Sequence, residues 1–197
     1  VRTEKAELIR VLAPLQGQYI LTVDLDAVRD RLHDLPWIRH ASLRRLLPET
    51  ILVELEEYEP AAIWRAEEGL RLIDRHGAIV PVTDLAPWRN LPVIAGSGAP
   101  QQVAALFDLL APFPDIARRM TGAAWVGGRR WNLLLDNRLE VRLPEQEPAA
   151  ALRQLARAQA QSRILDRAID AIDLRAREWM AIRPIRSDSR SSGRRAA

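Results

Sequence analysis

Hydrophobic and polar positions in the first third of the chain follow the period of an α-helix. Residues 4–13 and 24–35 each repeat Leu, Ile or Val at intervals of three and four, which places these side chains on one stripe. Thr3 and Asp24 stand where an N-cap is needed before each segment. The pattern predicts two helices, joined by a short extended piece at 19–24.

The pattern then changes to a period of two. Residues 51–57 alternate apolar with mostly acidic side chains, which predicts a strand with one dry face. The turn sequence LLPET precedes it, so segments 37–46 and 50–57 are predicted to pair antiparallel. A change of phase between Ile38 and Ala41 suggests a β-bulge. If the turn centres near Pro48, opposite charges face each other across the hairpin: His40 and Arg39 against Glu56 and Glu57.

After residue 60 the chain breaks into short extended segments separated by Gly and Pro. These are predicted as strands: 61–66, 70–74, 78–82, 122–128, 130–136, 138–143, 169–175 and 179–185. Segment 91–100 is predicted as a loop, and segments 101–113 and 148–161 are predicted as helices. The fold class is therefore α+β. A small domain of two helices on a short sheet is expected over 1–59, and an antiparallel β-rich domain with flanking helices over 60–185.

Charge is distributed unevenly along the 197 residues. The chain carries a net charge of +3, but residues 183–197 hold five Arg against Asp188, so the remaining 182 residues sum to −1. The tail 186–197 is predicted to be disordered and basic. Segment 37–60 itself is net −2, with three Arg against five Glu, and a phosphate-binding surface would not place an acidic strand beside a basic one. The charge pattern argues against nucleic-acid binding by the folded part.

The sequence offers no motif for catalysis, for a metal or for a cofactor. It has no cysteine, which excludes a disulfide scaffold, a thiolate zinc site and a cysteine nucleophile. His76 beside Asp74 reads as turn chemistry, and Asp24 as a helix cap. No apolar run is long enough to span a membrane, and the N-terminus lacks the three-part build of a signal peptide. Since the chain opens at Val1 without Met, we expect an excised part of a longer, non-enzymatic binding protein.

A resemblance sharpens this expectation. The stretch LPWIRHASLRRLLPETILVELEEYEPAAIW (35–64) resembles the POTRA signature of the bacterial cell-division family FtsQ/DivIB. The likeness continues through LIDRHGAIV, LPVIAGSGA, RRWNLLLDNRLEVRLP and IDAIDLR, and covers about residues 8–183. The Arg, Ala and Leu bias and the stretch VGGRRW resemble alphaproteobacterial members of the family.

The resemblance implies a POTRA domain whose first strand lies before Val1, followed by an FtsQ-type β domain. It also implies the periplasmic part of a single-pass inner-membrane protein at the division site, anchored by a helix upstream of this chain. Members of this family are non-enzymatic scaffolds that bind FtsB and FtsL and help to assemble the septal peptidoglycan machinery. No cofactor is implied.

In the family, FtsB adds a strand to the last strand of the β domain by β-augmentation. The matching positions are Arg175, Ala176, Arg177, Glu178, Trp179, Met180, Ala181 and Ile182. Some relatives carry Tyr where this chain has Ala176, and Trp179 is the candidate replacement for that aromatic anchor. A basic residue before strand 130–136 also faces the partner in relatives, which maps to Arg129 or Arg130. The alternative is that these arginines only solvate a face of the sheet.

Three other function classes remain for comparison. A POTRA-type chaperone or transport module of outer-membrane protein assembly or secretion predicts tandem POTRA repeats and a following barrel, and neither occurs in this sequence. A nucleic-acid binder would use the Arg-rich tail, and deleting 186–197 would then remove a salt-dependent affinity. A hydrolase has no residues to nominate.

Overall fold

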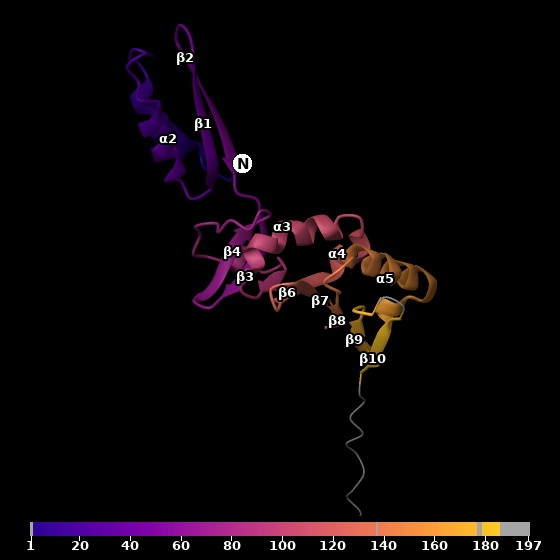
Figure 1. The fold of residues 1–197 in the computed structure, drawn as a ribbon. Helices are drawn as coiled ribbons and strands as arrows, with labels where there is room; N and C mark the ends of the chain where they lie inside the picture. Colours follow the sequence, from indigo (N-terminus) through magenta and orange to yellow (C-terminus); the bar gives the residue numbers. More distant parts are fainter. Residues whose placement is uncertain (1, 137, 177–178, 186–197) are drawn as a thin grey trace, which may run out of the picture.

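The N-terminal unit is a two-stranded antiparallel sheet with two helices on one face (Figure 1). The computed structural model describes residues 2–136, 138–176 and 179–185. Helices α1 (Lys5–Leu12) and α2 (Leu25–His33), with the 3₁₀ turn η1 (Ala13–Leu15), pack on strands β1 (Ile38–Leu46) and β2 (Thr50–Glu57). The dry face of β2 joins a core centred on Val28, Leu32 and Ile38, because the period-two and period-3.6 stripes meet there.

Most predictions for this unit are confirmed. The carboxylate of Asp24 caps α2 by accepting from the backbone N–H groups of Asp26 and Ala27, each at 3.1 Å. The strands pair antiparallel with His40 opposite Glu56, and a bulge lies between Ile38 and His40. An opposite-charge pair joins the two strands, but it forms between Arg39 and Glu56, at 2.5 Å, and not between Arg39 and the Glu57 predicted opposite it.

Three details of the prediction were wrong. Glu57 does not face Arg39, because its carboxylate accepts from the backbone N–H groups of Arg2 and Thr3 at 2.7 and 2.8 Å. Thr3 is consequently buried against β2 and is not the N-cap of α1, a position that Glu4 occupies without a side-chain bond. Segment 19–24 forms turns and is not extended, since the N–H of Thr22 donates to the carbonyl of Tyr19.

The C-terminal unit is one eight-stranded sheet in the order β10-β9-β8-β7-β6-β5-β3-β4. Its strands are β3 (Pro60–Ala66), β4 (Gly69–Asp74), β5 (Val93–Ala95), β6 (Met120–Val126), β7 (Arg130–Leu135), β8 (Glu140–Arg142), β9 (Ile169–Asp173) and β10 (Ala181–Pro184). The α+β class is confirmed. The sheet was expected to be antiparallel but is mixed: β3 with β5, β5 with β6, and β8 with β9 run parallel.

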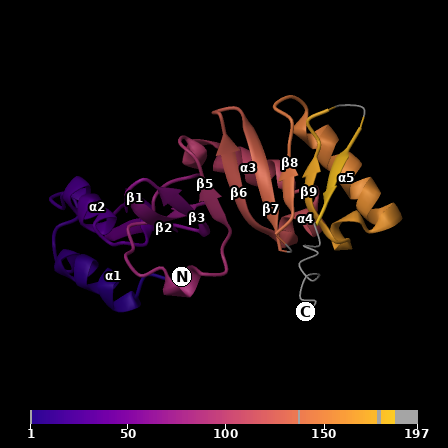
Figure 2. The ribbon, with the colours of Figure 1, turned by 90° about the horizontal axis from the view of Figure 1, so that it is seen from below.

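Helices supply the crossovers that parallel strands require. α3 (Ala99–Leu110) and α4 (Pro114–Arg119) connect β5 to β6, and α5 (Pro148–Ser162) with η3 (Ile164–Asp166) connects β8 to β9. All three α-helices lie on one side of the sheet (Figure 2), where they bury its apolar residues, among them Ile94, Leu133, Val141 and Ile172. The loop after β4, with η2 (Ala86–Trp88), forms a separate small apolar cluster with Ile63 and Leu72.

The predictions failed for three elements of this unit. β5 lies within segment 91–100, which was predicted as a loop. Segment 78–82 was predicted as a strand but contributes one isolated bridge, from Ile79 to Ile73. The short helix α4 was not predicted. In each case the segment is too short to show a hydrophobic period, and contacts with residues distant in sequence decide whether it forms a helix, a strand or a loop.

A compact joint connects the two units. The buried carboxylate of Asp74 at the end of β4 faces the guanidinium of Arg39 on β1, at 3.3 Å. The rings of Trp37 and Trp88 lie 5.8 Å apart, and the guanidinium of Arg2 lies 4.4 Å from the ring centre of Trp88. These contacts hold the N-terminal unit at the β3–β4 end of the large sheet (Figure 1).

Candidate partner-binding edge

β10 forms one edge of the large sheet, because it pairs with β9 and with no other described strand. The N–H of Leu174 donates to the carbonyl of Arg142 on β8. Because the N–H and C=O groups of successive residues point to opposite sides of a strand, those of Asp173, one residue earlier, point towards β10. Asp173 stands opposite Ala181. Alternation along β10 therefore directs the N–H and C=O of Ile182 outward, where they are free for another strand. Pro184 faces outward as well, at a position where a missing donor weakens no bond to β9.

Apolar side chains are exposed along this edge. Trp179 is 61% exposed, Ile182 45% and Ile185 55%. Met180 is half-buried and packs against the main core. The predicted site residues Arg177 and Glu178 lie outside the described residues.

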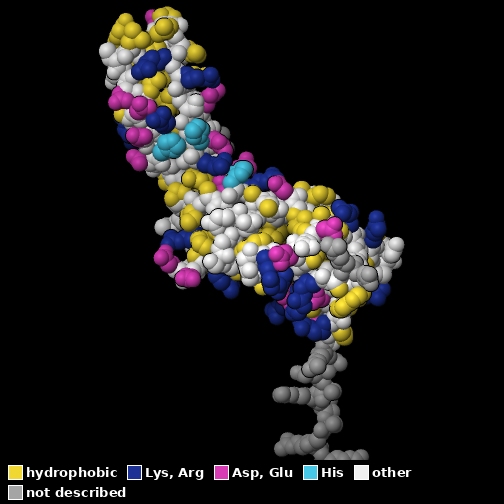
Figure 3. Space-filling model, viewed as in Figure 1, with side chains coloured by type: hydrophobic (Ala, Val, Ile, Leu, Met, Phe, Trp, Pro, Cys, Tyr) yellow, Lys and Arg dark blue, Asp and Glu magenta, His cyan; other side chains and the backbone are white. Residues whose placement is uncertain are grey.

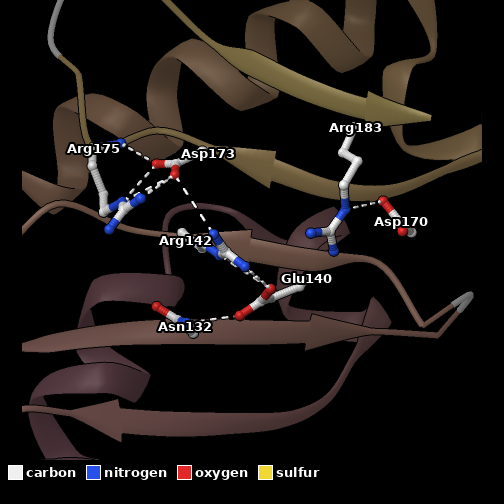
Figure 4. Close-up of polar contacts among 7 residues, drawn as sticks. All are labelled: Asn132, Glu140, Arg142, Asp170, Asp173, Arg175 and Arg183. Atoms are coloured by element: carbon white, nitrogen blue, oxygen red, sulfur yellow. Dashed lines mark hydrogen bonds and ion pairs between the residues drawn. The ribbon is translucent and has the colours of Figure 1, made fainter. Parts of the chain in front are cut away.

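Arg175 ends a ladder of alternating charges on the open face of the sheet (Figure 4). Its guanidinium donates to Asp173 at 2.6 to 3.0 Å, and Arg142 lies 3.9 Å from the same carboxylate. Arg142 in turn pairs with Glu140 at 2.8 Å, and Glu140 accepts from the side-chain amide of Asn132 at 2.8 Å. Every charged member of the ladder thus faces an opposite charge.

The ladder keeps its carboxylates ionised. The hydrogen bond from Arg175 holds the pKa of Asp173 below its usual value, although partial burial acts in the opposite direction. In the same way Arg142 lowers the pKa of Glu140. Arg175 is therefore not free in this structure, and a partner carboxylate has to share it with Asp173.

The structure brings together two parts of the predicted site that lie far apart in sequence. Arg130 begins β7 and Arg129 precedes it, and both line a single hollow of about 340 Å³ with Arg175, beside Pro144, Glu145 and Gln146. Arg129 lies 3.7 Å from Glu145. The Nε of Arg130 is buried and has no hydrogen-bond partner in the described part of the chain. Three guanidinium groups around one carboxylate suit the binding of a further carboxylate.

Two family models together match most of the chain. The model described as POTRA domain, FtsQ-type, matches residues 1–58, and the model described as cell division protein FtsQ/DivIB, C-terminal, matches residues 62–175. The chain belongs to the FtsQ/DivIB family of cell-division proteins. The C-terminal match ends at Arg175, so β10 lies beyond the part of the chain that the FtsQ/DivIB model recognises.

Similarity to individual FtsQ proteins agrees with this assignment. The chain is 32% identical to cell division protein FtsQ of Caulobacter vibrioides over 92% of its own length and 60% of the relative. It is 32% identical to FtsQ of Rhizobium radiobacter over 89% of this chain and 83% of that protein. A solved structure of the major extracytoplasmic domain of DivIB from Geobacillus stearothermophilus aligns with 55% of this chain and 97% of that one, at 17% identity and a TM-score of 0.37.

Other predicted chemistry has a structural explanation. The carboxylate of Asp74 accepts from the backbone N–H groups of His76 and Ala78, each at 2.8 Å, so the turn role predicted for this FtsQ/DivIB segment is confirmed. Within the described ranges no cluster of His, Asp and Glu could hold a metal ion. The helices in those ranges are too short or too polar to cross a membrane.

Sequence reasoning missed the charge ladder. The sequence predicts only that Glu140, Arg142 and Asp173 lie in strands. Glu140 and Arg142 are two residues apart, which places both side chains on the same face of their strand. The register between β8 and β9, which brings Arg142 opposite Asp173, comes from a parallel crossover through α5. That pairing could not be read from local periodicity.

Proposed function

We propose that this chain is a non-enzymatic scaffold of the divisome that binds FtsB and FtsL and links them to septal peptidoglycan synthesis. Its location would be the periplasm, at the division site, with an inner-membrane anchor outside this chain. The chain spans 60% of the Caulobacter relative, so these properties of the whole protein are proposed from the family. We assign residues 1–59 to a POTRA domain, 60–185 to the β domain and 186–197, which lie outside the described residues, to a basic tail.

The observation that carries this proposal is the free β10 edge. The backbone N–H and C=O of Ile182 face outward close to the exposed Trp179, and an arginine-lined hollow follows β9. A partner strand would gain main-chain hydrogen bonds from the edge and an aromatic contact from Trp179. An acidic side chain of the partner would enter the hollow that Arg129, Arg130 and Arg175 line. The match to the FtsQ/DivIB C-terminal model favours this function over an outer-membrane assembly module.

Ile182→Pro tests the edge directly. The substitution removes the outward N–H and leaves the bonds between β10 and β9 in place, so we expect FtsB capture to fall at least 10-fold (about 1.4 kcal/mol) with little change in thermal stability. Ile182→Val keeps the N–H and is the matched control. Binding of the periplasmic part of FtsB is measured by calorimetry.

A second variant tests the side-chain contacts. Trp179→Ala combined with Arg175→Gln removes the aromatic anchor and one cation, and we expect it to abolish detectable FtsB capture in a pull-down. Unchanged capture by both this variant and Ile182→Pro would contradict the proposed site.

A further inference from the structure

Helix α5 carries a polar stripe that faces an open groove. Its positions recur every three and four residues, as one face of a helix requires: Ala150, Arg153, Gln154, Arg157, Ala158 and Gln161. Together with Met180 they line a groove of about 540 Å³. The neighbouring stripe, with Leu152 and Leu155, is buried against the sheet. One face of α5 is therefore buried in the core, and the adjacent face, with Arg153 and Arg157, lines the open groove.

This groove lies alongside the free edge of the sheet. Met180, just before β10, is one of its lining residues. Ile182 stands opposite the buried Ile172, so its side chain points to the helical side of the sheet, yet it is 45% exposed because β10 is the last strand. Figure 2 shows α5 reaching past β10 at that edge. The helical cover of the sheet thus extends further than the strands do, and a ninth strand would lie beneath the polar stripe.

The groove has unpaired positive charge. Arg153 and Arg157 are exposed, and no described residue forms an ion pair or hydrogen bond with either side chain. By contrast, three other arginines of the C-terminal unit each contact a carboxylate within 3.0 Å: Arg163, Arg175 and Arg183. Side chains four apart on a helix project in the same direction, so the two guanidinium groups can hold one carboxylate between them. The small side chains of Ala150 and Ala158 leave room for it.

We propose that the Arg153/Arg157 stripe of α5 is a specificity surface for an acidic, extended segment of the partner that pairs with β10. The inference rests on the proposed β10 pairing and adds a sequence requirement to it. The partner strand carries an apolar side chain against Met180 and Ile182, and a carboxylate two residues away on the same face reaches Arg153 and Arg157. A period of two along the strand makes both contacts on the helical side.

Charge reversal tests the stripe. In the full chain, Arg153→Glu with Arg157→Glu is expected to weaken binding of the periplasmic part of FtsB at least 10-fold and to reduce the dependence of affinity on salt. Lys5→Glu with Arg89→Glu makes the same change in net charge at exposed positions of other elements, and we expect its affinity to stay within about 2-fold of the wild type. Melting curves of both variants check the fold, and Arg153→Gln with Arg157→Gln replaces the reversal if the glutamates destabilise α5.

The decisive result is a charge swap. Acidic residues of the FtsB segment are changed one at a time to lysine, and one such change is expected to weaken binding to the wild type and to restore binding to the Arg153→Glu, Arg157→Glu variant. If Ile182→Pro abolishes binding while the α5 variants bind as the wild type does, the stripe is not a recognition surface and the β10 site stands. If neither changes binding, both proposals are wrong.

Discussion

At the scale of single residues, Asp166 shows how the helical layer is tied together. Its carboxylate accepts from Arg119 on α4 at 2.5 Å, from Arg163 after α5 at 3.0 Å and from Gln159 on α5 at 3.2 Å. The hydrogen bond from Arg119, with those from Arg163 and Gln159, lowers the pKa of Asp166 from 3.8 to about 2. One side chain therefore joins two helices and the 3₁₀ turn that leads into β9.

This lowered pKa makes a prediction about acid stability. Because the pKa of Asp166 is lower in the folded state than in the unfolded state, its ionised carboxylate stabilises the folded protein above pH 3.8. This stabilisation is lost as the pH falls from about 4 to about 2. Asp166→Asn removes the titration, so the stability difference between wild type and variant should shrink over this range. Urea unfolding at pH 7, 4 and 2.5 measures it, and a difference that is independent of pH would contradict the assignment.

At the scale of elements, the turn after β4 is built for a close approach to α3. The turn closes through hydrogen bonds between Asp74 and Ala78 and between Gly77 and Asp74. Gly77 has φ +84°, and a Cβ there would lie 1.9 Å from the carbonyl oxygen of Pro100 in the first turn of α3. A glycine is required by both the backbone conformation and the lack of space.

Gly77→Ala should therefore destabilise the protein by about 2 to 4 kcal/mol, because strain at positive φ adds to a backbone clash. Gly17→Ala is the control, since Gly17 has φ +78° but no atom within 4 Å of its Cβ position. Its cost should be about 1 kcal/mol, from backbone strain alone. Urea denaturation of both variants separates the two effects, and equal losses would show that the approach to Pro100 is relaxed at little cost.

Elements also show where sequence reasoning was sufficient. The β1–β2 hairpin has long strands with a clear period of two and a local turn, so the register and the bulge followed from the pattern, whereas the partner of Arg39 did not. β5 is three residues long and is sandwiched between β3 and β6, with which it pairs in parallel. Its hydrogen bonds come from strands about 30 residues away on each side, and no local signal separates such a strand from a loop.

At the scale of the whole molecule, the joint between the units rests on a buried charge. Asp74 is 1% exposed, and one of its oxygens faces only Arg39, which is 30% exposed. Arg39→Ala would leave that carboxylate buried without its cation, with an expected loss of about 1 to 3 kcal/mol. Arg44→Ala is the matched control on the same strand, because Arg44 and Glu54 form an exposed pair that contributes about 0 to 1 kcal/mol.

Arg39→Ala should also change the overall dimensions of the molecule in solution. With the joint weakened, the N-terminal unit is expected to sample more orientations, so the radius of gyration in small-angle X-ray scattering should increase for Arg39→Ala and stay unchanged for Arg44→Ala. An unchanged profile would mean that Trp37, Trp88 and Arg2 hold the units together without the Arg39–Asp74 pair.

The sequence by itself determined the α+β class, the helices and hairpin of the N-terminal unit, the family resemblance and the strands of the candidate edge. Each depends on periodicity or motifs carried by neighbouring residues. Only the tertiary structure decided that the large sheet is mixed, that Arg129 and Arg130 meet Arg175 at one hollow, and that α5 overhangs β10. These features depend on parallel crossovers, which pair strands whose separation in sequence leaves no local trace.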